Sequence, residues 1–213
     1  MLVDLRVAQL LCSRLCHDLI GPVGAINTGF ELLEEEAGLP EDAMGLVARS
    51  AREVSRRLAF YRIAFGLGGG GALKPETARS VLADFLVDSR LELDWPLDPE
   101  SEARLPATGF KLILNLAIVV RESLPRGGLL TIRLKTETDG VVVSVRGAGQ
   151  GAKLRDEIEA VLTSHVEWDD LSARSAPAYL AVCLATGLGA AIKVGAVDGD
   201  ELTMTSLVPA VAV

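Results

Sequence analysis

The sequence predicts an α+β protein of two domains, in which an N-terminal antiparallel helical hairpin precedes a C-terminal α/β sandwich. Apolar residues recur every three or four positions over residues 11–33 and again over 47–65, which is the period of an amphipathic helix. After a run of glycines the pattern becomes mixed, and apolar residues alternate strictly on both sides of Asp139-Gly140, as in a β-hairpin. Two long helices, a linker and a mixed domain are therefore expected in that order.

The first helix is expected from about Asp4 to Ala37, although it contains Pro22. A proline inside a helix removes a hydrogen-bond donor and clashes with the preceding turn, at a cost of about 3 kcal/mol. The apolar stripe nevertheless continues through this position, which favours one kinked helix. A break at Gly21, with Pro22 opening a second helix, is the alternative.

The second helix is expected after a turn at Gly38-Leu39-Pro40, where Glu41 and Asp42 give the acidic first turn that complements the helix dipole. Two amphipathic helices cannot hide their apolar faces by themselves. Pairing two copies of the hairpin into a four-helix bundle is the usual solution, so the sequence predicts a homodimer.

A glycine-rich segment that includes four consecutive glycines follows the hairpin, and its backbone entropy is typical of a linker. We expect a helical-hairpin domain over 1–66, a linker over 67–74 and an α/β domain over 75–213. The glycines are not a P-loop, because no Gly-Lys-Ser/Thr closes the run and no strand precedes it. The second domain should contain helices over 75–88, 108–124 and 171–186, and strands over 91–95, 130–134, 141–145, 191–196 and 202–208.

Composition and charge argue against several classes of function. The 213 residues carry a net charge of −8 and the sequence pI is about 4.9, which argues against a nucleic-acid partner because phosphate binding needs a basic face. The longest apolar run is far shorter than the roughly 20 residues that cross a bilayer, so we expect a cytoplasmic protein with no membrane contact. Cys12, Cys16 and His17 lack a fourth ligand nearby, and no metal site is expected.

The candidate functional residue is His17. Successive helical residues turn by about 100°, which places this side chain on the opposite side of the helix from Leu15, Leu19 and Ile26, facing solvent. The segment Leu15-Cys16-His17-Asp18-Leu19-Ile20-Gly21-Pro22 resembles the H-box of two-component sensor kinases, in which an acid and then a helix-bending proline follow a phospho-accepting histidine. It is still more similar to the ChpT-like histidine phosphotransferases of bacterial phosphorelays.

The second domain resembles the ATP-binding domain of histidine kinases. The shared pattern is an asparagine-bearing helix at Asn115, a Pro-x-Gly-Gly turn ending at Gly128, a β-hairpin and two box glycines at 149 and 151. However, Gly147 stands where that family has the adenine-binding Asp, and Val119 stands at its second Asn. The phosphate-cradling glycines are also replaced, by the segment 174–179. The resemblance therefore implies a degenerate domain that keeps the fold without binding ATP.

The resemblance implies a histidine phosphotransferase. His17 would accept a phosphoryl group from the Asp of a receiver domain of an upstream hybrid kinase and pass it to downstream response regulators. Asp18 would orient the ring or accept its proton, and Arg14 would contact phosphoryl oxygens. The protein would need no cofactor of its own, with Mg²⁺ supplied by the receiver. The expected docking positions around His17 are Ser13, Ile20, Gly21 and Gly24.

Two other functions remain open from the sequence. One is an active ATP-dependent histidine kinase with a divergent nucleotide site, against which Gly147 argues. The other is a non-catalytic dimer that sequesters receivers, against which His17 argues. For Ile20, burial against the second helix is the alternative to exposure as a docking contact, and a merely solvated Arg14 or Asp18 is the alternative to their chemical roles.

Overall fold

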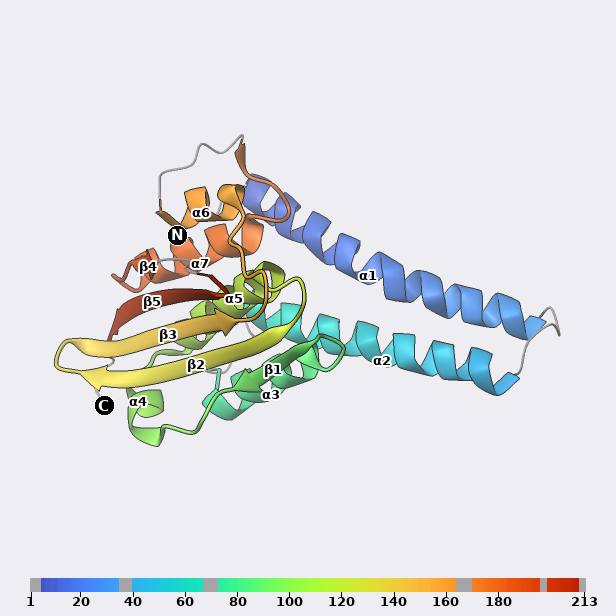
Figure 1. The fold of residues 1–213 in the computed structure, drawn as a ribbon, viewed down its shortest axis with the longest axis horizontal. Coiled ribbons are helices and arrows are strands. Elements are labelled where there is room, and N and C mark those ends of the chain that lie inside the picture. Colours follow the sequence, from blue (N-terminus) through green and yellow to red (C-terminus); the bar gives the residue numbers. More distant parts are fainter. Residues whose placement is uncertain (1–4, 35–39, 67–72, 164–169, 196–198, 211–213) are drawn as a thin grey trace.

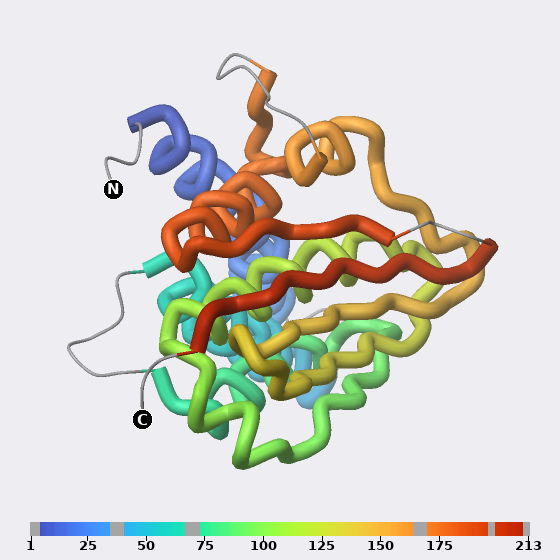
Figure 2. The backbone as a smooth tube through the Cα atoms, turned by 90° about the vertical axis from the view of Figure 1, so that its left-hand side faces the viewer, coloured from blue at the N-terminus to red at the C-terminus, as the bar shows by residue number. Residues whose placement is uncertain are grey.

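A computed structural model describes residues 5–34, 40–66, 73–163, 170–195 and 199–210. Two long helices project from one side of a mixed α/β body, whose strands lie together in a single layer (Figure 1). Figure 2 looks along the hairpin from the side of the sheet. The predicted order of a helical hairpin followed by an α/β domain is confirmed.

The hairpin consists of α1 (Leu5–Glu34) and α2 (Pro40–Ala64). Helix α1 runs through Pro22 without interruption, so the continuous helix is confirmed and the alternative break at Gly21 is wrong. The two helices approach closely at Gly29, where an added Cβ would lie 2.5 Å from Cγ2 of Val47. The predicted turn at Gly38-Leu39 lies outside the described residues.

The C-terminal part carries one five-stranded sheet in the order β1-β2-β3-β5-β4. Strand β1 pairs with β2 in parallel, and the other neighbouring pairs are antiparallel. The elements in chain order are α3 (Pro75–Leu86), β1 (Leu91–Asp94), α4 (Pro99–Arg104), α5 (Ala107–Ser123), β2 (Gly128–Glu137), β3 (Gly140–Ala148), α6 (Asp156–Thr163), α7 (Ala176–Gly187), β4 (Ile192–Val194) and β5 (Glu201–Pro209).

Two short helices, α4 and α6, were not predicted, and α7 begins at Ala176 instead of residue 171. Helix α4 has a local signal that could have revealed it. Asp98 caps its N-terminus by accepting a hydrogen bond from the Ser101 backbone N–H, and Pro99 occupies the first helical position. In α6 the acidic first turn and the spacing of Ile158, Val161 and Leu162 carry a weaker signal of the same kind.

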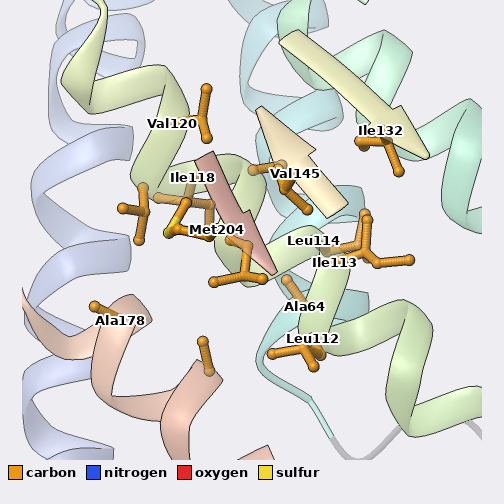
Figure 3. Close-up of a cluster of buried hydrophobic side chains, with 14 of the residues drawn as sticks. Ala64, Leu112, Ile113, Leu114, Ile118, Val120, Ile132, Val145, Ala178 and Met204 are labelled. Atoms are coloured by element: carbon orange, nitrogen blue, oxygen red, sulfur yellow. The ribbon is translucent and has the colours of Figure 1, made fainter. Parts of the chain in front are cut away.

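One hydrophobic core joins the hairpin to the sheet. Helix α5 lies against the buried face of the sheet, and Phe60, Tyr61 and Ala64 at the end of α2 belong to the same buried cluster. Figure 3 shows Ala64 among side chains of α5 and the strands. The Asn115 side-chain amide also donates a hydrogen bond of 3.0 Å to the Ala64 carbonyl oxygen. The base of the hairpin is therefore anchored in the α/β core, whereas most of the predicted linker (67–72) lies outside the described residues.

None of the helices in the described part of the chain is long and apolar enough to span a membrane. Within that part, no group of three His, Cys, Asp or Glu side chains is placed to hold a metal ion.

Candidate functional site

His17 lies in the middle of α1, and its side chain is 81% exposed. The prediction that the helical phase turns this ring towards solvent is confirmed. Its Nδ1 atom is 3.1 Å from Oδ1 of Asp18, while the rest of the ring is open to approach. The site is thus an accessible imidazole held on one side by the neighbouring carboxyl group.

Asp18 is largely buried, in contrast to His17. Its Oδ2 accepts hydrogen bonds from Nε of Arg14, at 2.8 Å, and from the hydroxyl group of Tyr61 on α2. Arg57 donates to its backbone carbonyl oxygen. Burial alone would raise the pKa of Asp18, but the hydrogen bonds from Tyr61 and Arg14 outweigh it and hold that pKa below its usual value. Asp18 is therefore a fixed, ionised acceptor at neutral pH.

The ionised state of Asp18 determines which nitrogen of His17 is free. A carboxylate can only accept hydrogen bonds, so the Nδ1 atom that faces it must carry the proton. In a neutral ring this leaves the lone pair on Nε2, which points away from Asp18. The arrangement presents Nε2 to solvent as a nucleophile.

Arg14 does not share the exposed face of His17, so its position gives no support to the predicted contact with phosphoryl oxygens. Its side chain is buried and pairs with Asp18 and with Glu122 of α5. The reason is its helical phase, because Arg14 lies only about 40° around α1 from Asp18. Both side chains therefore point towards the body of the protein. The alternative of a solvated Arg14 is wrong, because its side chain is buried and paired.

The four predicted docking positions are exposed around His17. Ser13 is exposed, Ile20 is 73% exposed, and a Cβ added at Gly21 or Gly24 would meet no atom within 4 Å. The alternative that Ile20 is buried against α2 is wrong. The face is low and accessible, as the docking prediction requires.

A groove of about 680 Å³ adjoins this face, beginning at Gly21, one helical turn after His17. Arg49, Arg52 and Arg56 of α2 line it together with Asp88, which follows α3. Glu53 lines the groove as well, so three arginines and two carboxylates give it a small basic excess, and Arg56 pairs with Asp88.

The family model of the histidine phosphotransferase C-terminal domain matches residues 75–200. Protein phosphotransferase ChpT of Brucella abortus (strain 2308) is 36% identical over 200 residues, which cover 92% of this chain and 93% of that protein. A solved structure of a bacterial phosphotransferase is also similar, with a TM-score of 0.81 and 32% identity over 97% of this chain and 98% of that one. The chain belongs to the histidine phosphotransferase family.

Family membership confirms the sequence-based prediction of a histidine phosphotransferase that acts in a phosphorelay. The roles of His17, Asp18 and Arg14, and of the docking positions, are not tested by these similarities and remain predictions. His17 lies on α1, outside the segment 75–200 that the family model matches.

The positions that correspond, by the sequence resemblance, to nucleotide-binding residues of histidine kinases lie in the core of the phosphotransferase. Gly147 lies on the buried face of β3, where an added Cβ would be 2.6 Å from Cγ1 of Val120 and 3.1 Å from Cδ1 of Leu124. Val119 is buried, and Asn115 is 0% exposed with its amide nitrogen bonded to backbone carbonyl groups. The residues present do not fit the adenine contact that an aspartate makes in working kinases.

Two residues of the site could not be found from the sequence. Tyr61 falls in the apolar stripe of the second helix, where it is expected only as a core residue, and Glu122 falls at the end of an apolar helix. Neither position carries a motif. The contacts with Asp18 and Arg14 arise only because the base of the hairpin folds against α5.

Proposed function

We propose that this phosphotransferase accepts a phosphoryl group from the aspartyl phosphate of one receiver domain onto Nε2 of His17, and passes it to the aspartate of a second receiver. The observation that carries the proposal is the exposed ring of His17 beside a buried carboxylate. Such a ring is accessible to a large protein substrate, and its reactive nitrogen is oriented before the substrate arrives.

In the first step the Nε2 lone pair attacks phosphorus in line, the N–P bond forms, and the P–O bond to the receiver carboxylate breaks. The His17 ring then carries a positive charge, which the ionised Asp18 stabilises through the Nδ1 hydrogen bond. The second step reverses the first, with a different receiver carboxylate as the nucleophile. Mg²⁺ and the acidic site that holds it belong to the receiver.

We propose further that the C-terminal domain does not bind ATP and that the protein needs no cofactor of its own. The support is the packing at Gly147, where Val120 and Leu124 occupy the direction in which an aspartate would point. Restoring the adenine contact would require these core side chains to move. ATP would then reach the relay only upstream, through the hybrid kinase whose receiver is the donor, which fits a cytoplasmic location.

The proposed active form is a homodimer in which two hairpins form a four-helix bundle. Large apolar side chains of α1, including Val23 (42% exposed) and Phe30 (50%), have no covering element in the single chain as described. A second copy would bury them. The basic groove that begins at Gly21 is the part of the surface that suits the acidic face of a receiver.

The proposal is tested with a ³²P-labelled receiver as the only phosphate source. The wild-type protein should become labelled, and the label should be acid-labile, as expected for a phosphoramidate. It should then appear on a second receiver. His17→Gln should abolish both steps, whereas His165→Gln, a change of the other histidine in the chain, should leave them intact. Transfer that survives His17→Gln would exclude His17 as the acceptor.

The same receivers and the same His17→Gln variant distinguish the two alternative functions. An active kinase would be labelled by γ-³²P-ATP without any receiver, while our proposal expects no label. A sequestering dimer would bind receivers equally well before and after His17→Gln but would never transfer label between them.

A further inference from the structure

A chain of charged and hydrogen-bonded side chains leads from the imidazole into the C-terminal domain. His17 contacts Asp18, Asp18 accepts from Arg14, and Arg14 pairs with Glu122. Tyr61 enters the chain from the side, through its hydrogen bond to the same Asp18 oxygen that Arg14 contacts. Three helices, α1, α2 and α5, thus each contribute at least one member.

The inner members of the chain are shielded from water, and the outer one is not. The exposed fractions of the Arg14, Asp18 and Glu122 side chains are 9%, 13% and 16%, and Tyr61 is buried. Ion pairs at such sites are screened far less than surface pairs, and removal of one partner leaves the other charge uncompensated. This series of shielded side chains therefore supports the exposed imidazole of His17.

Glu122 lies at the C-terminal end of α5, between two residues whose side chains contact the rest of the domain. The preceding residue, Arg121, places its guanidinium carbon 4.8 Å from the centroid of the Phe85 ring. The following residue, Ser123, is buried and donates a hydrogen bond of 2.8 Å to the Val119 carbonyl oxygen. The contacts of Arg121 and Ser123 tie this end of α5 to the domain, and Glu122 pairs there with Arg14.

The hydrogen bonds of Asp18 show how these side chains orient the ring of His17. Arg14 and Tyr61 both donate to Oδ2, which fixes the rotation of the carboxyl group and leaves Oδ1 directed at Nδ1 of His17. Loss of either donor frees the carboxyl group to rotate, so that Nδ1 no longer has a fixed acceptor. The ring could then populate the other tautomer, whose Nε2 carries a proton and has no lone pair for attack.

We propose that Glu122 and Tyr61 are positioning residues for phosphoryl transfer, acting through Arg14 and Asp18 to fix the reactive tautomer of His17. The inference rests on the proposed role of His17 as the phosphoryl acceptor. It gives the C-terminal domain a task in the reaction that needs no nucleotide, because that domain supplies Glu122.

The test reads the tautomer directly. The chain contains only two histidines, so long-range ¹H–¹⁵N spectra of protein labelled with ¹⁵N-histidine show two imidazoles, and the His165→Gln variant assigns them. At mildly alkaline pH the wild-type His17 ring should be almost entirely the Nδ1–H tautomer. In Glu122→Gln and in Tyr61→Phe, the nitrogen shifts should move towards those of a mixture.

The same variants should transfer phosphate from a labelled receiver about 10- to 100-fold more slowly, the loss expected when a reacting group is slightly misplaced. The matched control is Glu102→Gln, which breaks the buried pair between Glu102 and Arg79 in the same domain, away from α1. It should leave both the tautomer and the transfer rate unchanged. Tyr61→Phe keeps the aromatic packing, so it decides the matter if Glu122→Gln does not fold.

Wild-type nitrogen shifts in the folded variants would overturn the inference, as would slower transfer with an unchanged tautomer. Transfer that survives His17→Gln would instead refute the proposed function, and the tautomer measurement would still show whether the chain orients the ring.

Discussion

Helices α1 and α5 differ in how much of their surface the protein covers for itself. Of the 30 residues of α1, four are buried, and one of these is Arg14, whereas α5 buries 12 of its 17 residues. Other elements of the same chain cover helix α5, because it packs against the sheet, α2, α3 and α7. Helix α1 is left largely open. The contrast is consistent with the proposal that α1 meets partners, whereas α5 belongs to the core of the fold.

Exposed apolar side chains follow the same division. Among the described residues ten large apolar side chains are exposed, and seven of these lie on the hairpin. Isolated exposed apolar residues are normal, but a concentration on one element marks an interaction surface.

Gly147→Asp should destabilise the α/β domain by about 3 kcal/mol or more, because it places a charged side chain into space filled by Val120 and Leu124. The free energy of unfolding from urea titration measures this loss. ATP binding should not appear, as judged by isothermal titration calorimetry. A stable variant that binds ATP would show that the closed packing of α5 is not what separates this domain from a nucleotide site.

Changing Val23 and Phe30 together to aspartate should raise the dimer dissociation constant by about 100-fold or more, since each large apolar side chain contributes about 1.5–3 kcal/mol when buried. Sedimentation equilibrium measures the change. Leu207→Asp, at an exposed apolar position on β5, is the control and should leave the dimer intact. A wild-type protein that stays monomeric at high concentration would contradict the proposed bundle.

Asp18→Asn should cost about 1–2 kcal/mol of stability at neutral pH, because it removes a charged acceptor from Arg14 and Tyr61. The pKa of Asp18 is lowered in the folded protein, so its contribution is present above its ordinary pKa near 3.8 and is lost as the pH falls through the folded value. Urea titrations of both proteins at a series of pH values should therefore converge in acid. A constant difference would mean that the Asp18 charge does not stabilise the fold.

Gly24→Ala should stabilise the hairpin by about 0.5–1 kcal/mol, because alanine is the better helix former and the added Cβ meets nothing. If the face is a docking surface, the same variant should transfer phosphate more slowly despite a higher melting temperature. Gly29→Ala provides the contrast within α1, since its Cβ would lie 2.5 Å from Val47 and should destabilise the protein. Unchanged transfer in Gly24→Ala would remove this glycine from the docking surface.

Periodicity was sufficient to predict the long elements and the exposure of His17, because helical phase depends only on residues close in the sequence. It correctly carried α1 through Pro22 and located the hairpin around Asp139-Gly140. For Arg14, helical phase was not enough to predict burial. Phase gives a direction around the helix, but it does not say which distant element covers that direction, and here Glu122 of α5 does.

The remaining parts of the site depend on tertiary packing. Tyr61 matches the apolar pattern of α2, so the sequence does not reveal that its hydroxyl group bonds to Asp18. That contact appears only when α1 and α2 are placed together. The sequence singles out Gly147 as a departure from the histidine-kinase pattern, but only the structure shows that Val120 and Leu124 occupy the direction of an added side chain. Sequence reasoning thus found the exposed ring of His17 and missed much of what holds it.

The exposed imidazole of His17 has a kinetic consequence under the proposed function. If His17 is the phosphoryl acceptor, as proposed, donor and acceptor receivers would occupy the same face of α1 and would compete for it. Transfer should then follow ping-pong kinetics, in which an excess of the unphosphorylated acceptor slows loading and an excess of the donor slows unloading. The flux through the protein would depend on the ratio of its two partners as well as on their amounts.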